Sequence, residues 1–259
     1  MVKLKNYNAV LIPFVLFLTI LVSLNCSRKP LSVTNIEGSE IKISNSQGES
    51  AAIEAYIKPY REHINADLSA VLAYAPQTLD KSGEWQTTIG NLFADVVLSK
   101  GNPIFQKREN KSIDICLLNN GGIRSVINKG NVTARTAYEI MPFENALAVT
   151  ALKGDQIIEM TEYIISERKP HPLAGMRFEI GKDNKATNII INGQPLQNDK
   201  IYYVGTSDYL ANGGDNMVFF KKNVGRFDLE YKLRNMLIDY FKETDTLPVI
   251  TDIRISRQQ

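Results

Sequence analysis

Two short stretches of this chain carry the residue types best suited to holding a ligand, and each contains a pair of glycines. The residues concerned are Asn119, Gly121, Gly122 and Arg124 in the first stretch and Tyr209 and Asp215 in the second. Paired glycines allow backbone conformations that other residues avoid, and they let a ligand approach the main chain. One turn therefore offers an amide and a guanidinium, and the other offers an aromatic ring and a carboxylate. Such groups suit a polar anion that contains a ring.

Each of these groups has a functional and a structural interpretation. Arg124 suits bidentate binding of a phosphate or carboxylate, or it is a surface loop arginine. Phe143, which follows a proline, and Tyr209 are suited to sandwiching a planar base, but spacing alone equally allows both rings to pack in the core. Asp215 suits accepting hydrogen bonds from a vicinal diol, or it caps its own turn.

Catalytic motifs are missing from the sequence. The chain has two histidines, and no H-E-x-x-H, G-x-S-x-G, P-loop or G-x-G-x-x-G pattern. We expect His63 to be a surface residue on a helix and His171, between two prolines, to be a loop residue. A two-metal phosphoesterase needs several histidine and aspartate ligands converging on its cations. The sequence therefore predicts no metal site and no catalytic residue in this chain.

The N-terminal segment predicts export. Two lysines precede an apolar stretch at residues 9–24, which is typical of a secretory signal at residues 1–25. Cys26 follows directly, as in a bacterial lipoprotein whose cysteine is cleaved free and acylated. The alternative is an ordinary signal peptide with an incidental cysteine. The lipoprotein interpretation predicts a bacterial cell-envelope protein that is held by its lipid anchor and faces the periplasm.

Charge and cysteine content give no argument for nucleic-acid binding or for a disulfide in this chain. Beyond residue 25 there remain 28 basic and 28 acidic residues, which gives no electrostatic argument for binding nucleic acid. With Cys26 acylated, Cys116 is alone and cannot form an intramolecular disulfide. Its position in an alternating run predicts a small buried residue rather than a nucleophile.

Hydrophobic periodicity predicts one α+β domain at 51–259, behind a tether at 26–50 that holds at most an edge strand near 33–36. We expect helices at 53–68, 88–101, 133–141, 155–165 and 229–241, with caps at Thr88, Thr133 and Asp155 and a stop at Gly101. We expect extended segments at 69–74, 112–117, 146–152, 176–180, 188–191, 201–206 and 249–255.

From about residue 51 to 256 the chain resembles the C-terminal substrate-binding domain of 5′-nucleotidases. Six blocks carry the resemblance, and they occur in the family's order: 89–95, 119–124, 142–145, 152–154, 174–177 and 209–215. The resemblance implies a single mixed α/β domain of the 5′-nucleotidase C-terminal type.

The resemblance also implies a role for each pocket residue. A base would stack between Phe143 and Tyr209, and Asn119 would hydrogen-bond its edge. Asp215 would hold the ribose hydroxyls and Arg124 the phosphate, beside the glycines 121 and 122. Two further positions match residues that line the family's nucleoside pocket, namely Asn145 and Gly175.

The chain departs from the family pattern in two ways. Full-length members carry an N-terminal metallophosphatase domain with two metal ions, and the segment before residue 51 reads here as a signal and a tether. The family also often has a further arginine near the position of Gly83, where this sequence offers only Lys81, a point charge.

These observations predict the nucleotide- or nucleoside-recognition subunit of a split 5′-nucleotidase, an enzyme of nucleotide catabolism. The chain itself would hold no cofactor, and its activity would need a separate metallophosphatase chain carrying the divalent metals. The alternative is a lipoprotein that binds nucleosides or nucleotides without a catalytic role.

Overall fold

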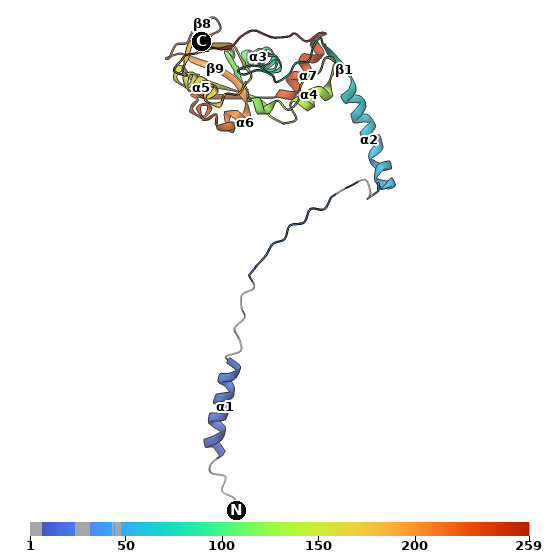
Figure 1. Cartoon of the computed structure of the whole chain (residues 1–259), viewed down its shortest axis with the longest axis vertical. Coiled ribbons are helices and arrows are strands. Elements are labelled where there is room, and N and C mark those ends of the chain that lie inside the picture. Colours follow the sequence, from blue (N-terminus) through green and yellow to red (C-terminus); the bar gives the residue numbers. More distant parts are fainter. Residues whose placement is uncertain (1–6, 24–31, 43, 45–47, 259) are drawn as a thin grey trace, which may run out of the picture. The chain divides into compact units, whose positions relative to one another are not determined.

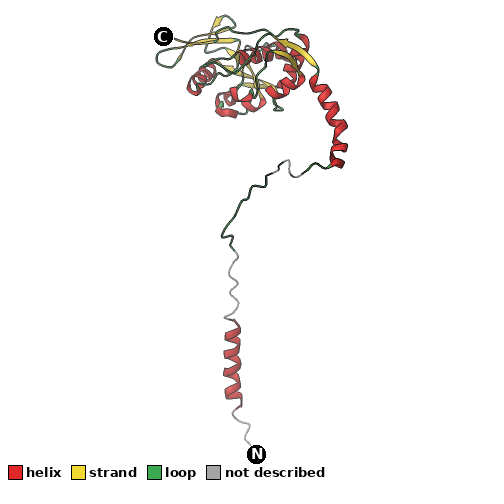
Figure 2. Cartoon of the chain, turned by 45° about the vertical axis from the view of Figure 1, so that its right-hand side comes forward, coloured by secondary structure: helices red, strands yellow, loops and turns green. Residues whose placement is uncertain are grey.

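The computed structural model describes residues 7–23, 32–42, 44 and 48–258. The chain divides into two units, Met1–Ala51 and Ala52–Gln259, whose elements are drawn in Figures 1 and 2. The second unit contains the sheets and all the helices but the first, apart from one residue of α2 at the boundary.

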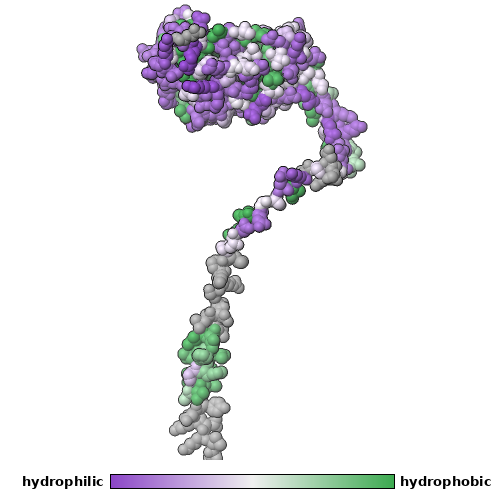
Figure 3. Space-filling view, in the orientation of Figure 1, coloured by the Kyte–Doolittle hydropathy of each residue, from purple (hydrophilic) through white to green (hydrophobic). Residues whose placement is uncertain are grey.

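The described residues of the first unit contain one helix, α1 (Tyr7–Ser23), within the predicted signal. Its side chains are predominantly apolar and exposed, as the hydrophobic colouring in Figure 3 shows. No helix in the described part of the chain combines the length and the apolar character that crossing a membrane requires. Cys26 lies outside the described residues. The described residues of the predicted tether form no helix or strand, so the edge strand expected near 33–36 is absent from them.

The main sheet positions the two diglycine turns, which are the stretches at 118–124 and 208–215 that contain the glycine pairs. Its strand order is β10-β4-β9-β2-β5, and the strands are β2 (Ile115–Leu117), β4 (Ala146–Lys153), β5 (Leu173–Ala174), β9 (Ile201–Ser207) and β10 (Gly225–Lys232). All neighbours are antiparallel except β2 and β9, which run parallel with Cys116 opposite Gly205. Because parallel neighbours end at the same edge of a sheet, the turns that follow β2 and β9 emerge beside each other.

Helices cover both faces of this sheet. Cys116 packs in one core cluster with side chains of α3 (Thr88–Glu109) and α7 (Leu233–Glu243). The adjacent residues, Ile115 and Leu117, belong to a second cluster with α5 (Gly154–Glu167). Alternate strand residues point to opposite faces, so a three-residue strand joins both cores. Cys116 is buried, as predicted, and burial raises the pKa of its thiol.

Two smaller sheets complete the domain. The first pairs β1 (Val71–Ala75) with β3 (Gly130–Thr133). The second has the order β11-β6-β7-β8, with β6 (Met176–Ile180), β7 (Ala186–Ile191), β8 (Gln194–Pro195) and β11 (Ile255–Arg257). The remaining helices are α2 (Ala51–Ser69), α4 (Ala134–Ile140) and α6 (Asp208–Ala211), with short 3-10 turns η2 (Asn120–Gly122), η3 (Gly214–Asn216) and η4 (Val218–Lys222). The predicted α+β class is confirmed.

Several predicted boundaries are wrong. Helix α3 does not stop at Gly101 but continues to Glu109. A Cβ at Gly101 would lie 2.7 Å from Leu147 Cδ2, so this glycine allows close helix–sheet packing instead of ending the helix. Leu229 lies in β10, and α7 begins only at Leu233.

Two predicted caps are displaced. Thr87 rather than Thr88 caps α3, since its Oγ1 accepts a hydrogen bond from Gly90 N–H at 2.9 Å. Helix α5 begins at Gly154, which leaves Asp155 in its first turn. Thr133 caps α4 as predicted.

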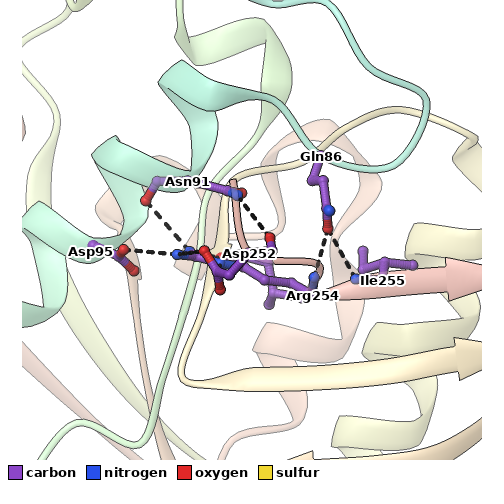
Figure 4. Close-up of polar contacts among 7 residues, drawn as sticks. Gln86, Asn91, Asp95, Asp252, Arg254 and Ile255 are labelled. Atoms are coloured by element: carbon purple, nitrogen blue, oxygen red, sulfur yellow. Dashed lines mark hydrogen bonds and ion pairs between the residues drawn. The ribbon is translucent and has the colours of Figure 1, made fainter. Parts of the chain in front are cut away.

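The predicted strand at 249–255 is also largely wrong, because β11 begins only at its last residue. Figure 4 shows the reason: side chains hold this segment. The Arg254 guanidinium donates to the carboxylates of Asp95 and Asp252 and to two main-chain carbonyls, those of Asn91 and Leu173. Gln86 Oε1 accepts the main-chain N–H groups of Arg254 and the next residue at 2.7 and 3.0 Å.

Candidate functional site

The structure brings eight of the nine predicted site residues to one pocket of about 380 Å³, which is lined by Asn119, Gly121, Gly122, Arg124, Phe143, Asn145, Tyr209 and Asp215. The first four come from the turn after β2. Phe143 and Asn145 lie between α4 and β4, and the last two belong to the turn after β9.

The main chain of the first turn is hydrogen-bonded by two side chains, those of His171 and Lys81. His171 Nδ1 accepts a hydrogen bond from Asn120 N–H at 3.2 Å. Lys81 Nζ donates to the main-chain carbonyls of Asn120 and Ile123 at 3.1 and 2.8 Å. Burial, and then the charge of Arg124, lower the pKa of Lys81. Lys81 therefore supports the turn with its hydrogen bonds and adds a positive charge near Arg124.

Arg124 lies at the end of this turn, with its side chain exposed. Its main-chain N–H donates to the carbonyl of Ile140 at 2.8 Å, and its Nη1 donates to the carbonyl of Gly121 at 3.3 Å. The guanidinium carbon lies 6.0 Å from the centre of the Phe143 ring. A cation and an aromatic face therefore share one end of the pocket.

The second turn forms a compact structure around Asp215. The Tyr209 hydroxyl donates to Asp215 Oδ1 at 2.8 Å and accepts the main-chain N–H of Asp215 at 3.2 Å. The Tyr209 ring lies against Gly214, where a Cβ would be 2.5 Å from two ring carbons. Asp215 itself has a φ of 50°, in the left-handed region.

The two turns are joined directly. Asn119 Nδ2 donates to Asp215 Oδ2 at 2.6 Å, although 96 positions separate these residues in sequence. The resemblance implied that Asn119 would bind a base edge; in this structure its amide nitrogen donates to the Asp215 carboxylate.

Burial excludes one of the alternatives that the sequence left open. Phe143 and Tyr209 are 42% and 45% exposed, so neither ring packs in the core. The Asp215 carboxylate accepts hydrogen bonds from the side chains of Asn119 and Tyr209, which lie in the two opposing turns. Two exposed rings, a guanidinium and an oriented carboxylate suit an anion that carries a planar ring and a diol.

Gly175 is not brought to this pocket. It lies between β5 and β6 with a φ of +75°, and a Cβ there would lie 2.1 Å from the carbonyl oxygen of Asp114. The turn between two strands and this close approach explain the glycine. Gly175 lines a separate pocket of about 580 Å³, together with Arg177 and Arg254.

The sequence reasoning missed the role of His171. It is buried, and burial lowers its pKa to about 4, with a further contribution from the charge of Lys169. Its ring contacts Tyr163, whose hydroxyl donates to the main-chain carbonyl of Asp215 at 2.7 Å. His171 and Tyr163 thus link the two turns, because His171 bonds the main chain of the first turn and Tyr163 bonds the main chain of the second. A histidine between two prolines carries no local signal of this burial. The other histidine, His63, is exposed on α2 as predicted.

The described residues do not fit a metal centre. They contain no cluster of three or more histidine, cysteine, aspartate or glutamate side chains that could hold an ion.

The fold is that of the C-terminal domain of 5′-nucleotidases, as comparison with known proteins shows. The family profile described as "5′-nucleotidase, C-terminal domain" matches residues 62–222, and the chain belongs to this family. The trifunctional nucleotide phosphoesterase YfkN of Bacillus subtilis is 30% identical over 160 residues, which are 56% of this chain and 10% of that protein. The 5′-nucleotidase of Vibrio cholerae is 21% identical over 78% of this chain and 36% of its own length.

Solved structures show the same fold. A 5′-nucleotidase precursor from Thermus thermophilus superposes with a TM-score of 0.67 at 26% identity, over 80% of this chain and 42% of that one. The NAD nucleotidase of Haemophilus influenzae gives a TM-score of 0.57 at 18% identity, over 81% and 42%. The chain thus spans less than half the length of these relatives.

Proposed function

We propose that this chain is the nucleotide-recognition subunit of a split 5′-nucleotidase. One observation carries the proposal: residues from two distant turns and an intervening loop line one pocket with complementary chemistry. The base would lie between the Phe143 and Tyr209 rings, Asp215 would accept the ribose hydroxyls, and Arg124 would bind the phosphate.

In this proposal the hydrolytic chemistry belongs to a second chain. A metallophosphatase partner would supply two divalent metals, which activate water and stabilise the developing charge on phosphate. This chain would bind the nucleoside part and orient the phosphate toward the partner, because correct positioning is itself a large part of rate enhancement.

Helix α2 supports association with a partner. It has no buried residue, and its Ile53, Tyr56, Tyr60 and Ile64 are between 54% and 71% exposed. Their spacing of three and four residues places them along one face of the helix. An uncovered apolar stripe of this kind at the edge of a domain is typical of a protein interaction site.

Titration calorimetry with adenosine and AMP tests the recognition part of the proposal. We expect both to bind, with AMP binding about tenfold more tightly because Arg124 contacts the phosphate. The Arg124→Gln variant should lose the preference for AMP while it keeps its affinity for adenosine. The matched control is Arg177→Gln, which removes an exposed arginine from the separate pocket that Gly175 lines. Binding of neither compound would refute nucleotide recognition.

Phosphate release from AMP tests the subunit role. A metal-loaded metallophosphatase chain of this family is assayed alone and with this protein, and we expect faster hydrolysis in the mixture. No stimulation would refute the subunit role. If adenosine still binds in that case, the non-catalytic binding lipoprotein becomes the correct interpretation.

We also propose that Cys26 carries a lipid that anchors the protein in a bacterial cell envelope, facing the periplasm, with residues 1–25 removed. The motivation is the position of this cysteine directly after an apolar segment. In cells fed a clickable fatty acid, the native protein should be labelled and recovered with membranes. The Cys26→Ser variant should be unlabelled, and equal labelling of both proteins would refute the anchor.

A further inference from the structure

The Asp215 carboxylate is held more firmly than a surface aspartate requires. Its main-chain N–H donates to the Tyr209 hydroxyl at 3.2 Å, and its main-chain carbonyl accepts from the Tyr163 hydroxyl at 2.7 Å. Its two carboxylate oxygens each accept one further bond, Oδ1 from Tyr209 at 2.8 Å and Oδ2 from Asn119 at 2.6 Å. Backbone and side chain are therefore fixed together.

The chemistry of these donors leaves the carboxylate able to bind a ligand. The Tyr209 hydroxyl and the Asn119 amide are neutral, so they orient Asp215 without cancelling its charge. An ionised carboxylate offers about four lone-pair positions on its two oxygens. With one position filled on each oxygen, each can still accept a hydrogen bond. Two adjacent acceptors at a fixed orientation match the two hydroxyls of a vicinal diol.

Tyr209 therefore has two separable parts. Its ring is exposed and rests against Gly214, where it forms one face of the pocket. Its hydroxyl contacts Asp215 through both a donated and an accepted hydrogen bond. The hydrogen bond to this carboxylate raises the pKa of Tyr209, so the hydroxyl remains a donor across the physiological range.

We infer that the Tyr209 hydroxyl and the Asn119 amide are positioning groups that fix the Asp215 carboxylate for a vicinal diol, so that the preference for a ribose over a deoxyribose depends on these two side chains. This inference rests on the proposed function and names the two side chains that orient its diol-binding carboxylate. The selectivity comes from Asp215, and the two neighbouring side chains act through it. A ligand that lacks one of the two hydroxyls leaves one of the two oriented carboxylate oxygens without its hydrogen bond to the ligand.

The Tyr209→Phe variant separates the two parts of the residue, because it keeps the ring and removes the hydroxyl. Titration calorimetry with adenosine, 2′-deoxyadenosine and 3′-deoxyadenosine measures the selectivity of each protein. We expect the native protein to prefer adenosine by about tenfold or more. In the variant, affinity for adenosine should fall by about tenfold while affinity for the two deoxy compounds changes little, so most of the preference is lost.

Two further variants complete the design. Asn119→Ala removes the donor on the other carboxylate oxygen, and it should also reduce the preference for adenosine. Tyr74→Phe is the matched control, since Tyr74 is 42% exposed on β1, outside the pocket. It should leave all three affinities unchanged. Thermal unfolding of each variant checks that the fold is retained, and a general loss of stability would not change the ratio of affinities.

The possible results distinguish the inference from the proposed function. Equal weakening of all three ligands by Tyr209→Phe would show that Tyr209 acts through something other than Asp215, and would overturn the inference alone. An unchanged preference for adenosine would do the same. If the native protein binds none of the three compounds, the proposed function fails and the inference fails with it.

Discussion

Replacing His171 with asparagine should remove much of the acid sensitivity of this fold. His171 Nδ1 accepts the Asn120 N–H at 3.2 Å beneath the first diglycine turn, and burial lowers its pKa from 6.5 to about 4. An asparagine Oδ1 can occupy a similar place and still accept this hydrogen bond, but it does not titrate. The variant therefore isolates protonation from the loss of a contact.

The size of the effect follows from the shift in pKa. Between pH 6.5 and 4 the unfolded chain binds a proton at this histidine that the folded chain does not. The stability linked to His171 is therefore fully present above pH 6.5 and is lost as the pH falls toward 4, at roughly 1.4 kcal/mol per pH unit. Between about pH 7.5 and about pH 4.5 the native protein should lose about 3 kcal/mol through this residue.

Urea unfolding at the two pH values measures the free energy of unfolding. The loss on acidification should be about 3 kcal/mol smaller in His171→Asn than in the native protein. The nearby carboxylates of Glu167 and Asp215 favour the protonated form of His171, and they are present in both proteins. The matched control is His63→Asn, because that histidine is exposed on α2. If native protein and His171→Asn lose stability in parallel, the histidine is not a buried neutral support of the turn.

Three further outcomes follow from the packing. Gly214→Ala places a methyl group 2.5 Å from the Tyr209 ring and should weaken adenosine binding by at least tenfold in calorimetry. In the control Gly121→Ala, the Cβ would meet its nearest neighbour at 3.5 Å, so this variant should fold normally with its turn intact. Similar, undiminished binding by both variants would contradict the packing. Arg254→Ala should lower the free energy of unfolding by roughly 3 kcal/mol, the lower end for a buried ion pair because its carboxylate partners are partly exposed; a change below about 1 kcal/mol in urea unfolding would contradict this role. Cys116 should react with a thiol reagent only after unfolding, and rapid labelling of the folded protein would contradict its burial.

Local patterns predicted most of the elements and failed where distant contacts intervene. Leu229 is in phase with the helical repeat that follows it, yet it lies in β10, because an edge strand completes the sheet beside β4. Gly101 has the composition of a helix stop, but its lack of a Cβ lets α3 approach the side chains of Leu147 and Ile113. In both places, tertiary packing overrides a local preference.

The same division applies to the candidate site. Glycine pairs, adjacent polar residues and a ring after a proline selected seven of the eight residues that line one pocket, and the eighth, Asn145, came only from the family resemblance. Gly175 matched the family pattern but lies in another pocket, where its φ of +75° and its approach to Asp114 account for it. His171 and Lys81 were assigned no part in supporting the turn, since the contacts that define their roles come from remote segments.

The sequence by itself determined the chemical groups of the pocket and the turns that present them, because turn chemistry depends on neighbouring residues. Only the tertiary structure decided that the two turns meet. They do so because β2 and β9 are parallel neighbours and end at one edge of the sheet. That pairing brings Asn119 within hydrogen-bond distance of Asp215. The tertiary structure also decided which side chains face the pocket and which are buried behind it and support its turns, since burial is a property of the packed chain.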